Sequence, residues 1–175
     1  LKVLFVDDSP TVRVAFRRLL MKQGFVVETA SNAVEGFERA IGGGFDIAII
    51  DYFMPEQNGD TLVRKLKLDA RTRSLQIAVI TGTYSDRVIS DSLAAGATEC
   101  VFKNEAKELF LARVSSLART VIDRQSVDNE RKRLEGILRS VGDGVYGVDR
   151  HGRMTFVNPA ARDMLGIPHD RELEG

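Results

Sequence analysis

Short apolar runs alternate with amphipathic stretches over residues 1–103 of the chain. The runs cover residues 3–6, 25–27, 45–51, 76–81 and 100–103 and are rich in Val, Ile and Phe. Three of them are apolar nearly throughout, which is typical of strands that are covered on both faces. Parallel strands with helices above and below are the usual source of that pattern, so the runs predict five strands of a parallel sheet.

Helix signals fill the segments between these runs. Capping or turn residues precede the amphipathic stretches, and glycines end two of them. The starts lie at Ser9-Pro10, Ser31, Asn58-Gly59 and Ser85, and the glycine ends lie at residues 42–44 and at Gly96. Five strand–helix units therefore occupy residues 1–121. The predicted fold class is α/β, an open and doubly wound five-stranded parallel sheet.

A much longer helical pattern runs from residue 106 to 141, interrupted only by Gly136. Apolar or long side chains recur at steps of three and four, with one three-residue slip after Arg124. They are Phe110, Val114, Leu117, Val121, Arg124, Val127, Arg131, Leu134, Leu138 and Val141. Two interpretations remain open, a lone solvated helix and a parallel dimeric coiled coil. We favour the coiled coil, and hence a homodimer through this helix, because the seam resumes after a highly charged middle.

The character of the chain changes again after the long helix. Residues 145–148 and 154–157 predict a hairpin, and Asn158-Pro159 predicts a helix that ends near Gly166. So short a segment rarely has a self-sufficient core, which indicates an incomplete second domain. We therefore expect a first domain over residues 1–121 and a truncated domain over 141–175. The helix over 106–140 would be the last helix of the first domain and would continue as a coiled-coil linker.

Charge and cysteine content narrow the function classes. The chain has 25 Lys and Arg against 25 Asp and Glu, so no general basic field favours nucleic acid as a partner. Cys100 is the only cysteine, which excludes a disulfide framework and suits a reducing cytoplasm. No uncharged stretch is long enough for a membrane span, and the N-terminus does not resemble a signal peptide. The missing initiator Met suggests that the sequence is an excerpt.

Candidate chemistry lies where the predicted strands end. Asp7 and Asp8 follow the first strand, Asp51 ends the third, Thr81 the fourth and Lys103 the fifth. Such ends meet at one edge of a doubly wound sheet. Three crowded carboxylates favour either protonation or a bound cation, and hard oxygen ligands suit Mg²⁺. A carboxylate there can also accept a phosphoryl group, with Thr81 and Lys103 binding its oxygens.

These residues and their spacing resemble the receiver domain of two-component response regulators. The resemblance rests on residues 3–9, 51–55, Asn58-Gly59, 80–82, 95–97 and Lys103. It implies that Asp51 is the phosphoacceptor, that Asp7, Asp8, Asp51 and the backbone carbonyl of Phe53 hold Mg²⁺, and that Thr81 and Lys103 bind phosphate. It also implies a histidine kinase or phosphotransfer protein as the partner. Two positions depart from the family, because Cys100 replaces its aromatic switch residue and Asn104 the proline after the lysine.

The segment from about residue 130 resembles the linker and the start of a PAS sensory domain. Residues 134–138, 141–145, 156–161 and 165–166 carry that likeness, together with Asp149 and Gly152. It covers less than half of the PAS fold. Receiver-plus-PAS chains often continue into a diguanylate cyclase or a histidine kinase, and the sequence does not choose between these outputs.

Three functions follow from these patterns. The first is a phosphorylation-controlled receiver, itself not an enzyme, that relays a switch through the long helix to the PAS segment and an output. The second is a receiver that serves as a phosphate-independent dimerisation platform. The third is a haloacid-dehalogenase-like phosphatase, which Asp7-Asp8-Ser9 disfavours because such enzymes need two aspartates separated by one residue.

Overall fold

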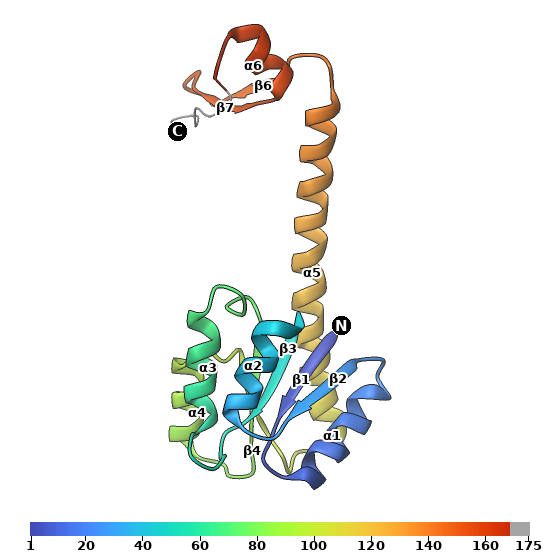
Figure 1. Ribbon diagram of the computed structural model, residues 1–175, viewed down its shortest axis with the longest axis vertical. Coiled ribbons are helices and arrows are strands. Elements are labelled where there is room, and N and C mark those ends of the chain that lie inside the picture. Colours follow the sequence, from blue (N-terminus) through green and yellow to red (C-terminus); the bar gives the residue numbers. More distant parts are fainter. Residues whose placement is uncertain (169–175) are drawn as a thin grey trace. The chain divides into compact units, whose positions relative to one another are not determined.

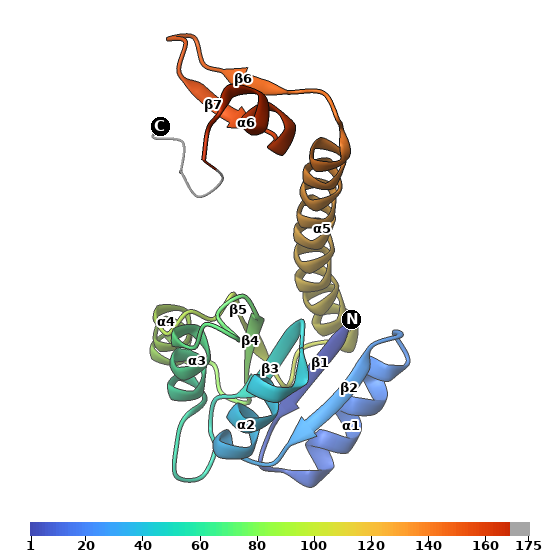
Figure 2. The same ribbon diagram turned by 45° about the horizontal axis from the view of Figure 1, so that its top comes forward.

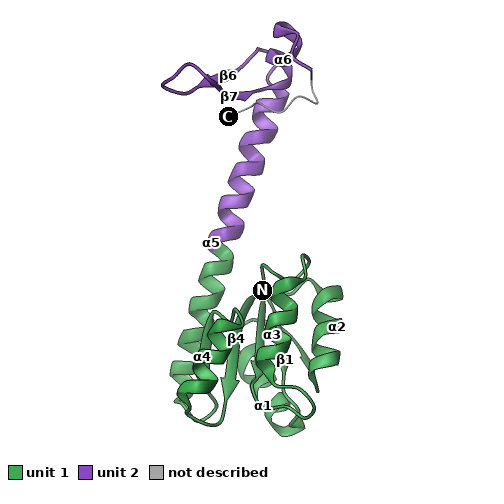
Figure 3. Cartoon of the chain, turned by 90° about the vertical axis from the view of Figure 1, so that its left-hand side faces the viewer, with its two compact units in different colours: residues 1–122 green, residues 123–175 purple. Residues whose placement is uncertain are grey.

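The computed structural model describes residues 1–168, which form two compact units. The first unit comprises Leu1–Ile122, and the second begins at Asp123 (Figure 3). The border falls inside one continuous helix, α5 (Lys107–Ser140), so the two units share a secondary-structure element. Each unit is described separately below.

The first unit is built on a five-stranded parallel sheet in the order β2-β1-β3-β4-β5 (Figure 1). The strands are β1 (Lys2–Val6), β2 (Val26–Ala30), β3 (Ile47–Asp51), β4 (Gln76–Thr81) and β5 (Glu99–Phe102). Every residue of β3 is buried, as expected for a strand that is covered on both faces. The predicted doubly wound parallel sheet is confirmed, and the order reverses between β1 and β3.

Helices cover both faces of this sheet (Figure 2). Residues of α2, α3 and α4 form one apolar layer with the sheet, and residues of α1 and α5 form the other. The shorter helices are α1 (Pro10–Met21), α2 (Ala33–Gly43), α3 (Gly59–Leu68) and α4 (Asp86–Ala94). This arrangement leaves the carboxyl ends of β1, β3, β4 and β5 at one edge, where the polar residues lie.

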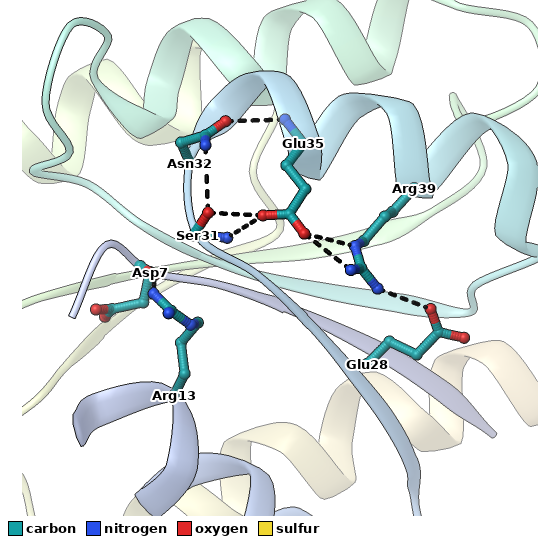
Figure 4. A network of polar contacts seen from close by, with 7 residues as sticks. All are labelled: Asp7, Arg13, Glu28, Ser31, Asn32, Glu35 and Arg39. Atoms are coloured by element: carbon teal, nitrogen blue, oxygen red, sulfur yellow. Dashed lines mark hydrogen bonds and ion pairs between the residues drawn. The ribbon is translucent and has the colours of Figure 1, made fainter. Parts of the chain in front are cut away.

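The start of α2 corrects one prediction. Ser31 was the expected cap, but Asn32 is the N-cap, and its side-chain oxygen accepts a hydrogen bond from the Glu35 amide at 2.9 Å. Ser31 instead donates its amide and its hydroxyl to the Glu35 carboxylate, each at 2.7 Å (Figure 4). Both residue types are good caps, so periodicity alone could not choose between neighbours. The caps Ser9 and Gly44 lie where predicted.

Helix α5 uses its apolar seam in two ways. Phe110, Val114, Leu117 and Val121 are buried against β1, β3, β4 and α1 of the first unit. This half of the seam therefore packs inside the first unit, and only the part beyond it is available to a second helix. From residue 122 to 137 every residue of the helix is exposed. The three-residue slip after Arg124 lies next to the border between the units, so it marks a change in what the seam packs against.

The second unit holds a small antiparallel hairpin and one helix. Strands β6 (Tyr146–Val148) and β7 (Met154–Val157) pair with each other, and α6 (Pro159–Leu165) follows. Asn158 is 1% exposed and organises this unit. Its side-chain oxygen accepts from the amides of Val145 and Ala161, at 2.8 and 2.9 Å, and its amide group donates to two carbonyls, of Leu138 and Asp143.

We expect Asn158→Ala to destabilise the second unit strongly. The substitution leaves the buried amide of Ala161, the partly buried amide of Val145 and two carbonyls without their partner, and each unsatisfied buried group costs about 1–3 kcal/mol. Hydrogen exchange at the Val145 and Ala161 amides should therefore accelerate at least tenfold. Arg153→Ala, at an exposed position of the same unit, is the control. Unchanged exchange in Asn158→Ala would contradict the account.

Candidate phosphoacceptor site

The structure brings the predicted polar residues together at the carboxyl edge of the sheet. Asp7 follows β1, and Asp51 and Thr81 end β3 and β4. Asp7 and Thr81 are fully buried and Asp51 is 3% exposed, whereas Asp8 is exposed. The carboxylates of Asp7, Asp8 and Asp51 each place an oxygen within 4.8 Å of the others. Three acidic groups thus share one small volume.

Lys103 compensates part of this negative charge. Its ammonium nitrogen lies 2.8 Å from an oxygen of Asp7 and 2.9 Å from an oxygen of Asp51. Burial lowers the pKa of Lys103, but the hydrogen bonds and charges of the two aspartates outweigh that effect and leave the pKa raised. The lysine backbone is anchored as well, because its amide donates to the Thr81 carbonyl at 2.8 Å. Lys103 therefore remains a fixed cation between the two carboxylates.

The surroundings favour the charged form of Lys103 but disfavour the charged form of Asp51. Burial raises the pKa of its carboxyl group, Lys103 lowers it, and the charges of Asp7 and Asp8 raise it further, so the net shift is upward. One lysine thus does not neutralise the cluster. A divalent cation would supply the missing charge, and the hard carboxylate oxygens are the ligands that Mg²⁺ prefers. The residues present therefore fit a magnesium ion.

The loop after β4 lies beside this cluster. The Thr81 hydroxyl accepts a hydrogen bond from the Thr83 amide at 3.2 Å. Tyr84, in the same loop, stacks on Phe102, the residue before Lys103, with the ring centroids 5.0 Å apart. Cys100 is half-buried, and burial raises the pKa of its thiol. A raised pKa disfavours the reactive thiolate, which agrees with the position of Cys100 in strand β5 rather than in a redox site.

Sequence reasoning missed the roles of two further residues. A Cβ at Gly59 would lie 2.2 Å from the backbone oxygen of Asp51, so only glycine lets α3 begin this close to the acceptor strand. Arg13, in α1, donates to the backbone oxygens of Asp7 and Asp8. Gly59 was visible as part of an Asn-Gly turn signal. The sequence shows Arg13 only as a helical residue about one turn after the acidic pair, which does not indicate a role at the site.

We expect Asp51→Asn to raise the free energy of unfolding at pH 7 measurably in buffer without Mg²⁺. The pKa of Asp51 is higher in the folded chain than its ordinary value of 3.8, so ionisation of this group opposes folding at neutral pH. The difference between the two proteins should shrink as pH falls through that raised pKa, because Asp51 then becomes neutral too. Urea titrations over a range of pH test this, and a variant less stable than wild type at pH 7 would contradict it.

Residues 3–115 match the family model of the response regulator receiver domain, which covers more than half of the chain. The chain belongs to the response regulator receiver family. Residues 132–174 match the model of the PAS fold, so a PAS segment follows the receiver. Receiver domains are regulatory and not themselves enzymes, and the acidic edge described above is where such domains generally bind Mg²⁺.

Curated relatives and solved structures agree with this membership. A putative transcriptional regulator of Pseudomonas aeruginosa is 34% identical over 150 residues, which cover 78% of this chain and 70% of that protein. The transcriptional regulatory protein CusR of Escherichia coli is 32% identical, and the match covers 68% of this chain. This chain spans about half (52%) of the length of CusR.

Two solved structures show the likeness in three dimensions. The chemotaxis protein CheY4 of Vibrio cholerae superposes with a TM-score of 0.63 at 29% identity, covering 66% of this chain and 97% of CheY4. A probable two-component system response regulator/GGDEF domain protein gives 0.65 at 30% identity, covering 69% of this chain and 50% of that one. Within the described part of the chain, no helix has both the length and the apolar character that a membrane crossing needs.

Proposed function

We propose that the chain is a phosphorylation-controlled receiver that accepts a phosphoryl group on Asp51. The observation that carries this proposal is the position of Lys103, whose ammonium contacts both Asp51 and Asp7. A purely structural lysine would need only one carboxylate to satisfy its charge. Here two buried carboxylates contact one cation, and the exposed carboxylate of Asp8 lies near both of them, which leaves negative charge for a metal and a site for a phosphoryl group.

The proposed transfer uses the residues of this site as follows. One carboxylate oxygen of Asp51 attacks the phosphorus of a phosphohistidine on a histidine kinase or phosphotransfer protein. An oxygen–phosphorus bond forms, the phosphorus–nitrogen bond breaks, and its electron pair stays on the imidazole nitrogen. The Lys103 ammonium and the Thr81 hydroxyl then bind oxygens of the transferred group. These donors stabilise charge that builds up during transfer, which is how such sites lower a reaction barrier.

The metal ligands of this proposal come from the same edge. Asp7, Asp8, Asp51 and the backbone carbonyl of Phe53 would hold Mg²⁺, with water completing its shell. When bound, the ion neutralises the carboxylates and the incoming phosphoryl oxygens. Residues Asp7 and Asp8 serve this role without touching the phosphorus, so they are expected to govern metal affinity more than acceptor identity.

Intact-mass measurement with acetyl phosphate and Mg²⁺ tests the proposal. The wild-type protein should gain one phosphoryl group, and Asp51→Asn should gain none. Asp86→Asn, in the first turn of α4 and outside the acidic cluster, is the matched control and should behave as wild type. No gain in the wild type with acetyl phosphate or with a panel of histidine kinases would refute the proposal and favour the phosphate-independent platform.

We further propose that α5 relays the switch and pairs with α5 of a second copy. From 122 to 137 every residue of α5 is exposed, large apolar side chains such as Val127, Leu134 and Ile137 among them, which favours a partner. Val127, Leu134 and Leu138, on one side of the helix, line with Phe156 an apolar groove of about 430 Å³. The apolar seam therefore continues on the exposed half, and we propose that an identical helix packs against it.

Leu134→Asp should weaken this dimer at least tenfold, because it places a charge in the apolar seam. Lys132→Asp changes the charge on the opposite side of the same turn and should leave association nearly unchanged. Sedimentation equilibrium over a range of protein concentrations measures both. A wild-type protein that stays monomeric at high concentration, or equal effects of the two variants, would contradict the proposed dimer.

The output domain of the relay is also a proposal, which rests on two relatives. The probable response regulator/GGDEF protein pairs a receiver with a GGDEF domain, and a hybrid histidine kinase of Dictyostelium discoideum is 32% identical over 115 residues. Both outputs expected from the sequence thus occur among relatives. The expectations that the chain itself contacts no nucleic acid and works in the cytoplasm stay predictions.

A further inference from the structure

We propose that Arg13 is a positioning residue for the magnesium site, an inference that rests on the proposed function. The residue lies in the first turns of α1, outside the acidic cluster itself. One terminal nitrogen of its guanidinium donates to the backbone oxygen of Asp7 at 2.7 Å and to that of Asp8 at 2.9 Å. A single side chain thus holds the backbone of both N-terminal acidic residues.

The loop that Arg13 holds is short and has few other restraints. The Asp7 amide belongs to the sheet, since it donates to the Ala30 carbonyl at 3.1 Å. The Ser9 amide donates to the Asp7 carboxylate at 2.9 Å, and helix α1 begins directly afterwards. Asp8, the exposed member of the acidic cluster, is fixed between these points through its backbone oxygen. Removing the guanidinium would release that peptide.

The guanidinium also lies on the side of the loop away from the carboxylate. Figure 4 shows the Asp7 carboxylate directed away from Arg13, which meets the Asp7 backbone instead. The carbonyls are thus held from one side, and the carboxylate is presented on the other. Such a backbone clamp fixes where the Asp7 and Asp8 carboxylates can point without occupying the cation's position.

Two opposing effects decide whether a substitution of Arg13 weakens or strengthens Mg²⁺ binding. The positive charge of Arg13 repels a nearby cation, so its loss would strengthen Mg²⁺ binding. Its hydrogen bonds orient two ligands, and Mg²⁺ demands near-ideal octahedral geometry, so their loss would weaken binding. Arg13 is partly exposed, and solvent screens its charge. Removing a group that orients metal ligands typically lowers metal affinity about 10–100-fold, and we assign about that range to the lost hydrogen bonds of Arg13. We therefore expect the substitution to weaken Mg²⁺ binding.

Calorimetric titration with Mg²⁺ alone, without a phosphodonor, tests the inference. Arg13→Gln removes the charge, and Arg13→Lys keeps it but cannot reproduce the rigid guanidinium contact with both carbonyls. Both should raise the Mg²⁺ dissociation constant about tenfold. Arg17→Gln is the matched control, because Arg17 is an exposed arginine on the same helix, and it should bind Mg²⁺ as wild type does.

A second readout separates positioning from a general loss of structure. The phosphorylation rate at saturating Mg²⁺ should stay within about twofold of wild type, while the Mg²⁺ concentration that gives half the rate rises with the dissociation constant. Equal or tighter Mg²⁺ binding by Arg13→Gln would overturn the inference and leave the proposed function standing. A wild-type protein that binds no Mg²⁺ would overturn both.

Discussion

Replacing Lys103 with alanine should slow phosphorylation of Asp51 by about 10²–10³-fold, the usual loss when one fixed charge-stabilising donor is removed. Lys103 is the cation that contacts Asp51, at 2.9 Å, and the hydrogen bonds that raise its pKa keep it charged at neutral pH. Without it, a dianionic donor must approach buried carboxylates whose only compensation is the metal. Initial rates with acetyl phosphate, followed by intact mass at saturating Mg²⁺, measure the effect.

Lys107→Ala is the control for this substitution, because Lys107 is exposed at the start of α5 and lies outside the acidic cluster. Magnesium binding provides a second check. Removal of a cation from among three carboxylates should not weaken Mg²⁺ binding. A variant that is phosphorylated slowly but still binds Mg²⁺ is therefore folded and impaired only in the transfer reaction. A rate within threefold of wild type, on the order of 0.6 kcal/mol, would contradict the role assigned to Lys103.

Phe110→Ala should lower the free energy of unfolding of the receiver by about 3–5 kcal/mol. Phe110 is 3% exposed and meets Phe16 edge-to-face, with the centroids 4.9 Å apart. Phe16 in turn stacks on Phe5 of β1 at 5.1 Å. The ring therefore joins α5 to α1 and the sheet, and its removal leaves a cavity at that junction. Urea denaturation monitored by circular dichroism measures the loss.

The neighbouring residue Leu109 offers a matched control, because it lies on the same turn of α5 and is 47% exposed. Leu109→Ala should change stability by about 0.5 kcal/mol or less. If both variants were destabilised equally, the contacts of the α5 seam with the sheet would not explain how the helix is held. A strongly destabilised Phe110→Ala beside a near-neutral Leu109→Ala would support that explanation.

The strands could be predicted because burial on both faces leaves a simple sequence signal. β4 (76–81) and β7 (154–157) have the predicted bounds, and the other strands differ from the predicted runs by one to three residues at an end. Helical periodicity and capping residues likewise predict where the helices lie. Neighbouring residues with the same capping chemistry are harder to separate, which is why Ser31 was chosen over Asn32.

The long helix shows a different limit. A repeat of three and four residues arises when a helix packs on a sheet and when it packs on another helix, so the seam alone does not tell where one kind of packing gives way to the other. The strand–helix count, by contrast, predicts a first domain that extends to residue 121. The change of phase at Arg124 was the available clue. It lies next to the point where the structure passes from one compact unit to the other.

The acidic edge was predictable because topology gathers the ends of parallel strands. Asp7, Asp8, Asp51, Thr81 and Lys103 lie where that rule places them, although their chemical roles stay proposals. The supporting contacts were not predictable. The backbone clamp by Arg13 and the close approach at Gly59 depend on distances between backbone atoms, which no residue pattern encodes.

The position of the acyl phosphate is the most direct test of the central proposal. The protein is incubated with acetyl phosphate and Mg²⁺, and borohydride then reduces the acyl phosphate, so that the modified residue carries a stable mass change that peptide mapping can locate. We predict that this change lies at Asp51 and is lost when Mg²⁺ is chelated. A modification at Asp7 or Asp8, or none at any residue, would contradict the account.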